Sequence, residues 1–219
     1  MKKILFVLTL IISVFLLNSC SSLNPEKYVA KYNIPLTSVE SPSDARNQYS
    51  KVQINSLVKD DINYYQYEDS FINIIWYVSP KEFAFELTNK SDHPIKINWD
   101  DISYVDYTGS VGRVMHSGVK YVDKNNSQPA TTIPRGASLT DTLLPVDNVY
   151  YGSYIHDWIK NYLLPCRYKD QSSFSKNAEK NIGRTMKILM PIVIENVQND
   201  YVFEFTVKEL LNPELGISK

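Results

Sequence analysis

Residues 83–99 read FAFELTNKSDHPIKINW, and the pattern in this stretch indicates the class of fold. Its large apolar residues alternate with other residues on both sides of a short turn: Phe83, Phe85 and Leu87, then Ile95, Ile97 and Trp99. A period of two places such side chains on one face of a β-strand. Between the two runs, residues 89–94 include Asn, Ser and Asp, whose side chains bond the local backbone in turns. The stretch therefore predicts two strands joined as a hairpin or as a connection between two sheets.

Similar short strands are indicated along most of the chain from Lys51 onward. The candidates cover residues 52–56, 62–67, 71–78, 102–107, 113–116, 139–144, 188–194 and 201–207. Sixteen tyrosines against seven glycines also favour a strand-rich chain, because aromatic side chains pack well across neighbouring strands. Pro191 lacks an N–H group, so we expect its strand at a sheet edge or beside a bulge. These features predict an all-β fold, a Greek-key or immunoglobulin-like β-sandwich.

Residues 83–95 resemble the strand–turn–strand unit that is common in immunoglobulin-like domains of bacterial lipoproteins. The resemblance is limited to this unit. It implies a sandwich fold, and it implies no activity.

One region departs from the two-residue alternation. Apolar and aromatic residues recur there at helical spacing: Tyr154, Ile155, Trp158, Ile159, Tyr162 and Leu163. This spacing predicts a short helical insertion near residues 154–164, ending before Pro165. Residues 167–183 are polar and are expected to form a loop. The insertion would either cap one end of the sandwich or contact a partner or a membrane.

The amino terminus has the pattern of a cleaved export signal. Lys2 and Lys3 precede an apolar run over residues 4–17, which is too short to span a bilayer as a helix. The run ends at residues 17–20, which read Leu-Asn-Ser-Cys. An ordinary secretory signal and a short membrane anchor with an incidental cysteine are the alternatives.

Residues 17–20 resemble the bacterial lipobox, in which a leucine three residues before the cysteine and a small residue directly before it fit the lipoprotein signal peptidase. Asn18 is less usual at its position. The resemblance implies cleavage before Cys20, diacylglycerol on the Cys20 sulfur and a further acyl chain on the new amino group. Two or three acyl chains hold a protein on a bilayer far more firmly than one chain does. Ser21 replaces the aspartate that marks inner-membrane retention in enterobacterial lipoproteins, so the resemblance favours the outer membrane, facing the periplasm.

On this interpretation the chain has four parts. They are a signal peptide (residues 1–19), a lipidated N-terminus and spacer (20–50), the β-sandwich domain (51–210) and a C-terminal tail (211–219). Loss of Lys2 and Lys3 lowers the number of basic residues from 23 to 21 against 24 acidic residues, so the formal charge becomes −3. This charge does not favour nucleic acid as a partner. The expected partners are membrane lipid, through the acylated Cys20, and a protein of the cell envelope.

The sequence contains no recognisable catalytic motif, and it predicts a protein that is not an enzyme and needs no cofactor. Residues 109–112, which read GSVG, lack the spacing of a nucleophile elbow. Cys166 is expected to be a small buried residue, and the alternative is a reactive thiol paired with a histidine. The histidines are His93, His116 and His156.

Four aspartates lie near one another in the sequence: Asp100, Asp101, Asp106 and Asp123. They either solvate the ends of strands or supply oxygen ligands for calcium. They match no known calcium-binding loop, so a solvated role is preferred and no metal site is predicted.

Tyrosines are the remaining candidates for a binding surface. Two groups stand out: Tyr64, Tyr65 and Tyr67, and Tyr150, Tyr151 and Tyr154. The second group, with Trp158, is the expected surface, because aromatic side chains bury a large area with little loss of entropy. The preferred function is a non-catalytic interaction or assembly module. A glycan-binding lipoprotein is the alternative, and a hydrolase with an unrecognised site is third.

Overall fold

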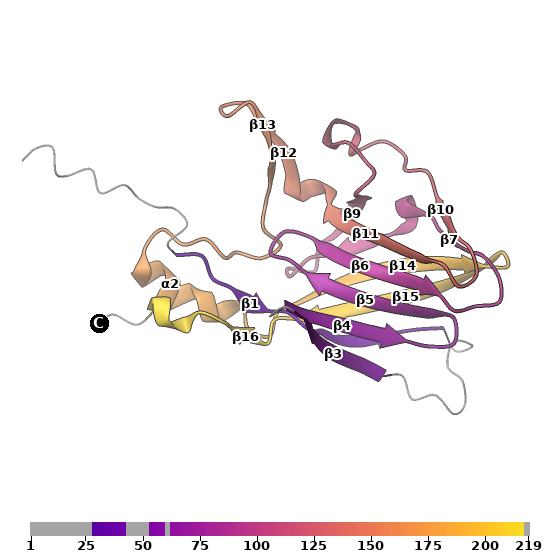
Figure 1. Cartoon of the computed structure of the whole chain (residues 1–219). Helices are drawn as coiled ribbons and strands as arrows, with labels where there is room; N and C mark the ends of the chain where they lie inside the picture. Colours follow the sequence, from indigo (N-terminus) through magenta and orange to yellow (C-terminus); the bar gives the residue numbers. More distant parts are fainter. Residues whose placement is uncertain (1–27, 43–52, 60–61, 217–219) are drawn as a thin grey trace, which may run out of the picture.

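The computed structural model describes residues 28–42, 53–59 and 62–216, which form an all-β sandwich (Figure 1). One layer contains, in spatial order, β3 (Gln53–Lys59), β4 (Ile62–Glu68), β5 (Ile72–Val78), β6 (Phe83–Asn89) and β11 (Ser138–Pro145). The other layer contains β10 (Thr131–Ile133), β7 (Ile95–Ile97), β14 (Thr185–Ile194), β15 (Val197–Thr206) and β2 (Leu36–Glu40), with β8 (Ser103–Val105) also beside β14. The expected all-β sandwich is confirmed.

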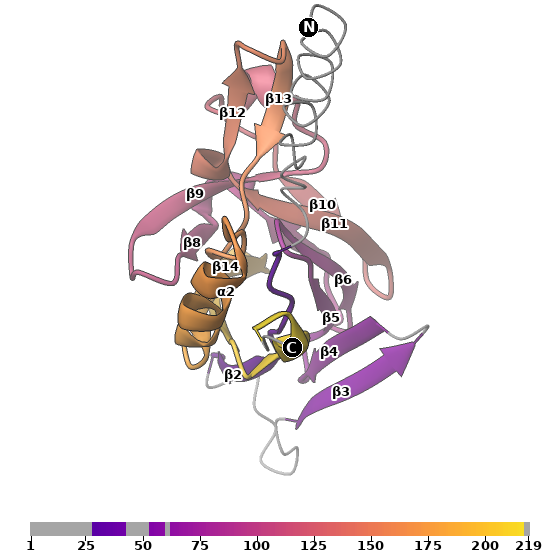
Figure 2. The same ribbon diagram turned by 90° about the vertical axis from the view of Figure 1, so that its left-hand side faces the viewer.

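β9 (Val111–His116) joins the two layers along one side. It pairs with β8, which belongs to one layer, and with β11, which belongs to the other. Figure 2 shows β9 beside β8 at this side of the body. The sandwich is therefore continuous across this side and resembles a partly closed barrel.

The two-residue alternation in the sequence matches the burial of side chains. In β6 every second residue from Phe83 to Asn89 is buried. Trp76 on β5 lies at the centre, where its ring centroid is 5.2 Å from Phe85 in its own layer and 5.1 Å from Phe203 in the opposite layer. A fully buried phenylalanine contributes roughly 1.5–3 kcal/mol. Aromatic packing between the layers therefore holds the sandwich together.

The turn over residues 89–94 connects the layers and does not form a hairpin, because β6 and β7 belong to different layers. Asn89 is fully buried in this turn. Its Nδ2 donates to the carbonyl oxygens of His93 at 2.8 Å and Ile133 at 3.0 Å. Its Oδ1 accepts from the backbone N–H of Ser91 at 3.0 Å and from the Ser91 hydroxyl at 2.7 Å. The predicted turn chemistry is therefore confirmed, with one side chain fixing the whole connection.

The prediction of a helix near residues 154–164 is wrong. This region belongs to a hairpin made of β12 (Val149–Gly152) and β13 (Asp157–Lys160). A helix does occur further along, as α2 (Gln171–Asn177), inside the polar segment that was expected to be a loop. Asp170 caps its first turn by accepting a backbone hydrogen bond, which is a strong helix-start signal.

The folded body also begins earlier than the expected boundary at residue 51. β2 pairs with β15 as the outer strand of its layer. β1 (Tyr32–Asn33) pairs with β16 (Glu209–Leu210), and the short helical turn η6 (Pro213–Gly216) lies against α2. Parts of the expected spacer and of the expected tail therefore belong to the fold.

The expected signal peptide and Cys20 lie outside the described residues, so the lipid anchor stays a prediction. None of the helices in the described part of the chain is long and apolar enough to cross a bilayer.

Candidate functional site

The four aromatic residues singled out in the sequence lie on the hairpin of β12 and β13. Tyr150 and Tyr151 belong to β12, Trp158 belongs to β13, and Tyr154 lies in the loop between the strands. The hairpin stands away from the sandwich in both views (Figures 1 and 2). Tyr154 is 99% exposed, and its neighbour Ile155 is 61% exposed. We call β12, β13 and the loop between them the aromatic hairpin.

Cross-strand pairing explains the arrangement of the aromatic hairpin. Tyr151 faces Trp158, with ring centroids 5.7 Å apart in an edge-to-face geometry, and such pairs contribute roughly 0.2–1 kcal/mol. The loop turns closely against Gly152, where an added Cβ would lie 2.7 Å from Cδ1 of Ile159. His156 in the loop has a φ of 52°, which histidine adopts more readily than β-branched residues do. The sequence therefore favours a tight turn at this point.

A small apolar cluster fixes the base of the aromatic hairpin. Four buried side chains form it: Met115, Leu144, Val146 and Val149. Trp158 extends this cluster by packing edge to face on Tyr121, with ring centroids 5.8 Å apart. The base is therefore held by burial, while the loop is left in water.

Two lysines add polar links between the aromatic hairpin and the body. Lys124 donates from Nζ to the carbonyl oxygens of Val146, at 2.9 Å, and Val149. Lys160 donates from Nζ to Oε2 of Glu82 at 2.8 Å, and this bond raises the pKa of Lys160 above its usual value. Because both ammonium groups are engaged at the base, the outer surface of the hairpin is aromatic rather than cationic.

The other tyrosine group does not form a surface platform. Tyr65 and Tyr67 are both buried on the inner face of β4. The Tyr67 hydroxyl donates to Oδ2 of Asp69 at 2.9 Å, and the Tyr201 hydroxyl donates to the same oxygen at 3.0 Å. Burial raises the pKa of Tyr201, and the nearby Asp69 carboxylate raises it further. These buried tyrosines are part of the hydrophobic core.

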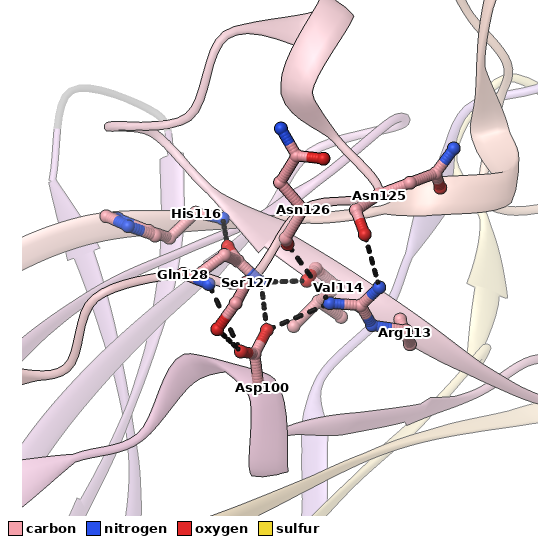
Figure 3. Close-up of polar contacts among 8 residues, drawn as sticks. All are labelled: Asp100, Arg113, Val114, His116, Asn125, Asn126, Ser127 and Gln128. Carbon is pink, nitrogen blue, oxygen red and sulfur yellow. Dashed lines mark hydrogen bonds and ion pairs between the residues drawn. The ribbon is translucent and has the colours of Figure 1, made fainter.

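Asp100 ties the loop before β10 to β9 (Figure 3). Its Oδ2 accepts from the Ser127 hydroxyl at 2.5 Å and from the backbone N–H of Gln128 at 3.1 Å. Its Oδ1 accepts from Nη2 of Arg113 at 2.9 Å. These bonds, with that from Ser127 the strongest influence, hold the pKa of Asp100 below its ordinary value. Protein donors therefore already occupy both oxygens of this carboxylate.

Asp101 lies next to Asp100 in the short helical turn η2 (Trp99–Asp101) and is exposed, whereas the remaining two aspartates belong to other turns. Asp106 closes the β8–β9 turn by accepting from the backbone N–H groups of Thr108 at 2.7 Å and Ser110 at 3.0 Å. Burial acts to raise the pKa of Asp106, but the turn hydrogen bonds together outweigh it, so the pKa is lowered. Asp123 accepts from Nδ2 of Asn126 at 3.1 Å. Within residues 28–42, 53–59 and 62–216, no three His, Cys, Asp or Glu side chains gather closely enough to hold a metal ion.

Cys166 is buried, and burial raises the pKa of its thiol to about 12. The interpretation of Cys166 as a small buried residue is confirmed. His116 pairs instead with Asp141, with 3.1 Å between Nδ1 and Oδ2, and its ring stacks on Trp99 at a centroid distance of 4.2 Å. Asp141 also accepts from the backbone N–H of Ser117 at 2.9 Å. The pair therefore fastens the end of β9 to β11.

Two hollows flank the segment that follows the aromatic hairpin. A polar groove of about 440 Å³ lies between this segment and the β8–β9 turn, with Tyr107 and Tyr162 in its lining. An apolar pocket of about 290 Å³ lies toward β1 and β5. Leu163, Leu164 and Cys166 line both hollows. Sequence reasoning missed both, because their walls come from segments that lie far apart in the chain.

No protein-family model matches the chain, and a search of curated proteins finds no match either. Function is therefore inferred from the residues and their arrangement.

Proposed function

We propose that this protein is a lipid-anchored component of the bacterial cell envelope that binds a protein partner through the aromatic hairpin and performs no catalysis. The observation that carries the proposal is that Tyr154 and Ile155 are exposed at the end of the aromatic hairpin, whose base is buried and fixed. Binding energy concentrates in aromatic side chains of this kind, since they bury a large area with few rotatable bonds. A rigid base also lowers the entropy lost on binding.

The amino-terminal sequence supplies the tether in this proposal. Acyl chains on Cys20 would hold the mature protein on a bilayer, because each buried methylene contributes about 0.8 kcal/mol. Tyr28 is the first described residue and follows Cys20 by eight residues, which span at most about 29 Å when extended. The sandwich would therefore work close to a membrane, and we place it at the outer membrane, facing the periplasm.

Site-specific photo-crosslinking in cells that express the full chain tests the partner. A photoreactive amino acid at position 154 should give one discrete crosslinked protein. The matched control is the same amino acid at Val197, which is 63% exposed and begins β15 directly after the β14–β15 turn. This turn lies away from the aromatic hairpin (Figure 1). No product from position 154, or the same product from position 197, would contradict the proposal.

The double substitution Tyr154→Ser with Ile155→Ser gives a second test. It should remove the crosslinked partner from detergent extracts of the envelope while leaving the protein in the membrane fraction. The partner recovered in undiminished amount from this variant would show that another surface holds it.

A glycan is the second candidate ligand, and the polar groove favours it. Asn148 and Asn161 flank this groove at the base of the aromatic hairpin, where the Asn161 N–H donates to the Asn148 carbonyl oxygen at 2.7 Å. Tyr162 also lines the groove. Side-chain amides offer both donors and acceptors to sugar hydroxyls, and tyrosine rings present apolar faces with a polar edge.

A glycan array separates the two candidates. Residues 21–219 without lipid and the variant Asn148→Ala with Asn161→Ala, which removes both amides from the groove, should be compared on the same array. Binding that is lost in the variant supports a glycan ligand, and absence of binding by the parent removes this candidate.

A further inference from the structure

The apolar pocket opens beside the point where the described chain begins. Its volume of about 290 Å³ lies near the lower limit of small-molecule sites. Its walls come from residues 30–34, 62, 63, 65, 77–80, 163, 164 and 166, together with Leu211. Backbone hydrogen bonds fix these walls, since Ala30 N–H donates to Cys166 O at 2.7 Å and Leu163 N–H donates to Pro80 O at 2.9 Å. The pocket is therefore part of the fold and needs no rearrangement to form.

The inner wall of the pocket is mainly apolar. Its buried residues are Ala30, Ile34, Tyr65, Leu163, Leu164 and Cys166. The Cys166 thiol is neutral at physiological pH, because burial raises its pKa to about 12. A strongly polar ligand would lose its water here without gaining a partner.

The hydroxyls of Tyr65 and Tyr32, two tyrosines that line the pocket, already have partners in the protein. Tyr65 donates to Oδ1 of Asn33 at 2.7 Å. Tyr32 donates to the carbonyl oxygen of Ala178 at 2.9 Å and accepts from Nδ2 of Asn181 at 2.9 Å. These two hydroxyls therefore need no hydrogen bond from a ligand, which favours an apolar group in the buried part of the pocket.

Exposed residues mark the mouth of the pocket: Lys31, Ile62 and Asn63. Among the described residues that line the pocket, Lys31 is the one with a charge. An ammonium group at the rim suits a ligand with an anionic end outside and an apolar body inside.

We propose that this pocket binds one alkyl chain of a fatty acid or lipid, with the chain against Leu163 and Leu164 and the anionic end of a fatty acid at Lys31. The proposal goes beyond partner binding, which uses a different surface. Two sources supply an alkyl chain, and the first of them, the acyl chain on Cys20, has no anionic end. Ala30 follows Cys20 by ten residues, at most about 36 Å, so the protein's own acyl chain reaches the pocket if the proposed anchor forms. A free fatty acid is the other source.

Titration calorimetry with hexanoate, octanoate and decanoate tests the proposal. The protein is the unlipidated chain of residues 21–219, which retains every contact described above. One ligand should bind per protein, and affinity should rise about fourfold for each added methylene until the chain outgrows the pocket. Absence of binding, or an affinity independent of chain length, would overturn the proposal.

Variants that fill the pocket test its location. Val78→Trp introduces a large ring at a half-buried position that lines the pocket, and it should abolish binding. Leu164→Trp is a second filling variant, for use if the first does not fold by circular dichroism. Val193→Trp is the matched control, since Val193 is half-buried on β14 and does not line the pocket. Equal binding by a folded filling variant and by the control would reveal non-specific association and overturn the proposal.

A charge reversal at the mouth tests the orientation of the ligand. Lys31→Glu should weaken decanoate binding roughly fivefold, as expected for an exposed ion pair, and should leave decanol binding unchanged. Lys96→Glu on β7 is the control, because this exposed lysine is not part of the pocket. Equal effects of Lys31→Glu on the two ligands would contradict the proposed orientation.

Cys166 gives an independent readout, because it is the only thiol in residues 21–219. Bound decanoate should slow alkylation of this thiol by iodoacetamide several-fold. Without added ligand, alkylation that is slower in the lipidated full-length protein than in residues 21–219 identifies the protein's own acyl chain as the occupant, and equal rates assign the pocket to a free fatty acid. Alkylation that saturating decanoate does not change would place the ligand elsewhere and overturn the assignment.

Discussion

Asp69 is a buried carboxylate that joins the two layers, and it is only 6% exposed. Its Oδ1 accepts from the backbone N–H groups of Phe71 and Ile72, each at 2.8 Å. Its Oδ2 accepts from the hydroxyls of Tyr67 on β4 and Tyr201 on β15. One residue therefore closes the β4–β5 turn and connects it to the opposite layer.

Replacing Asp69 should be costly. Asp69→Ala leaves four donors without their acceptor, so we expect the free energy of unfolding to fall by about 3 kcal/mol or more. Urea denaturation measures this change. Asp92→Ala is the control, because Asp92 is exposed and pairs only with the exposed Arg135, and it should cost less than about 0.5 kcal/mol. Similar values for the two variants would contradict the proposed role of Asp69.

Asp100 makes one loop sensitive to acid. Folding lowers the pKa of Asp100 below its ordinary value of 3.8. The hydrogen bonds of the carboxylate therefore stabilise the loop fully above pH 3.8, and this stabilisation is lost as the pH falls through the pKa of the folded protein. We expect the Gln128 backbone N–H, which donates to Asp100 at 3.1 Å, to lose protection from hydrogen exchange in this range. Asp100→Asn should remove the pH dependence. The same pH dependence in parent and variant would contradict this assignment.

Among the structural elements, the aromatic hairpin depends on Gly152. Gly152→Val brings side-chain atoms against Ile159 and Ile155, which lie 2.7 and 3.1 Å from an added Cβ. We expect this variant to disturb the Tyr151–Trp158 pair, seen as weaker cross-strand NMR contacts, while global stability changes by less than about 1 kcal/mol. Ser153→Val is the control in the same loop. Intact cross-strand contacts in Gly152→Val would show that the close approach is not needed.

Residues 154–164 show why helical spacing misled the sequence-based interpretation. Apolar residues at positions 154, 155, 158 and 159 fit one face of a helix. In the hairpin, by contrast, Tyr150 pairs across the strands with Ile159, and Tyr151 pairs with Trp158. Periodicity detects burial along one continuous face, whereas this element is buried only at its base. The aromatic residues could be chosen from the sequence, but the element that presents them could not.

Pro191 illustrates a second limit of sequence-based reasoning. Its strand, β14, is not at an edge, since it pairs with β15 along its whole length. On the other side, β8 covers Lys187 to Leu189 and β7 covers Ile192 to Ile194. Pro191 lies between these two short partners, where neither pairs with it. Neither the expected edge position nor the alternative, a bulge in the β14–β15 pairing, is present, and pairing is instead interrupted at Pro191 on the side of β7 and β8.

Across the whole molecule, the packing of two layers sets features that no local pattern contains. Trp76 and Phe203 meet in the core although more than a hundred residues separate them in the chain. The apolar pocket likewise depends on segments from residue 30 to residue 211. Alternation predicted that strands exist and which faces are buried, and it could not predict which strands pair.

The position of β2 leads to a prediction about the limits of the domain. A chain that begins at residue 51 lacks β2 and exposes the edge of β15, and it loses the buried residues Ile34 and Leu36. We expect it to be less stable by about 3 kcal/mol or more and prone to aggregate, because two buried aliphatic side chains and one edge pairing are lost. A chain that begins at residue 28 should unfold like residues 21–219. Equal melting temperatures for the chains that begin at residues 21, 28 and 51 would contradict this boundary.

The tether determines where the whole molecule acts, and mass spectrometry of the protein purified from membranes tests it directly. We expect an amino-terminal peptide that begins at Cys20 and carries diacylglycerol with an additional acyl chain. A free thiol at Cys20, or a leader that is still attached in a protein recovered outside the membrane fraction, would contradict the account.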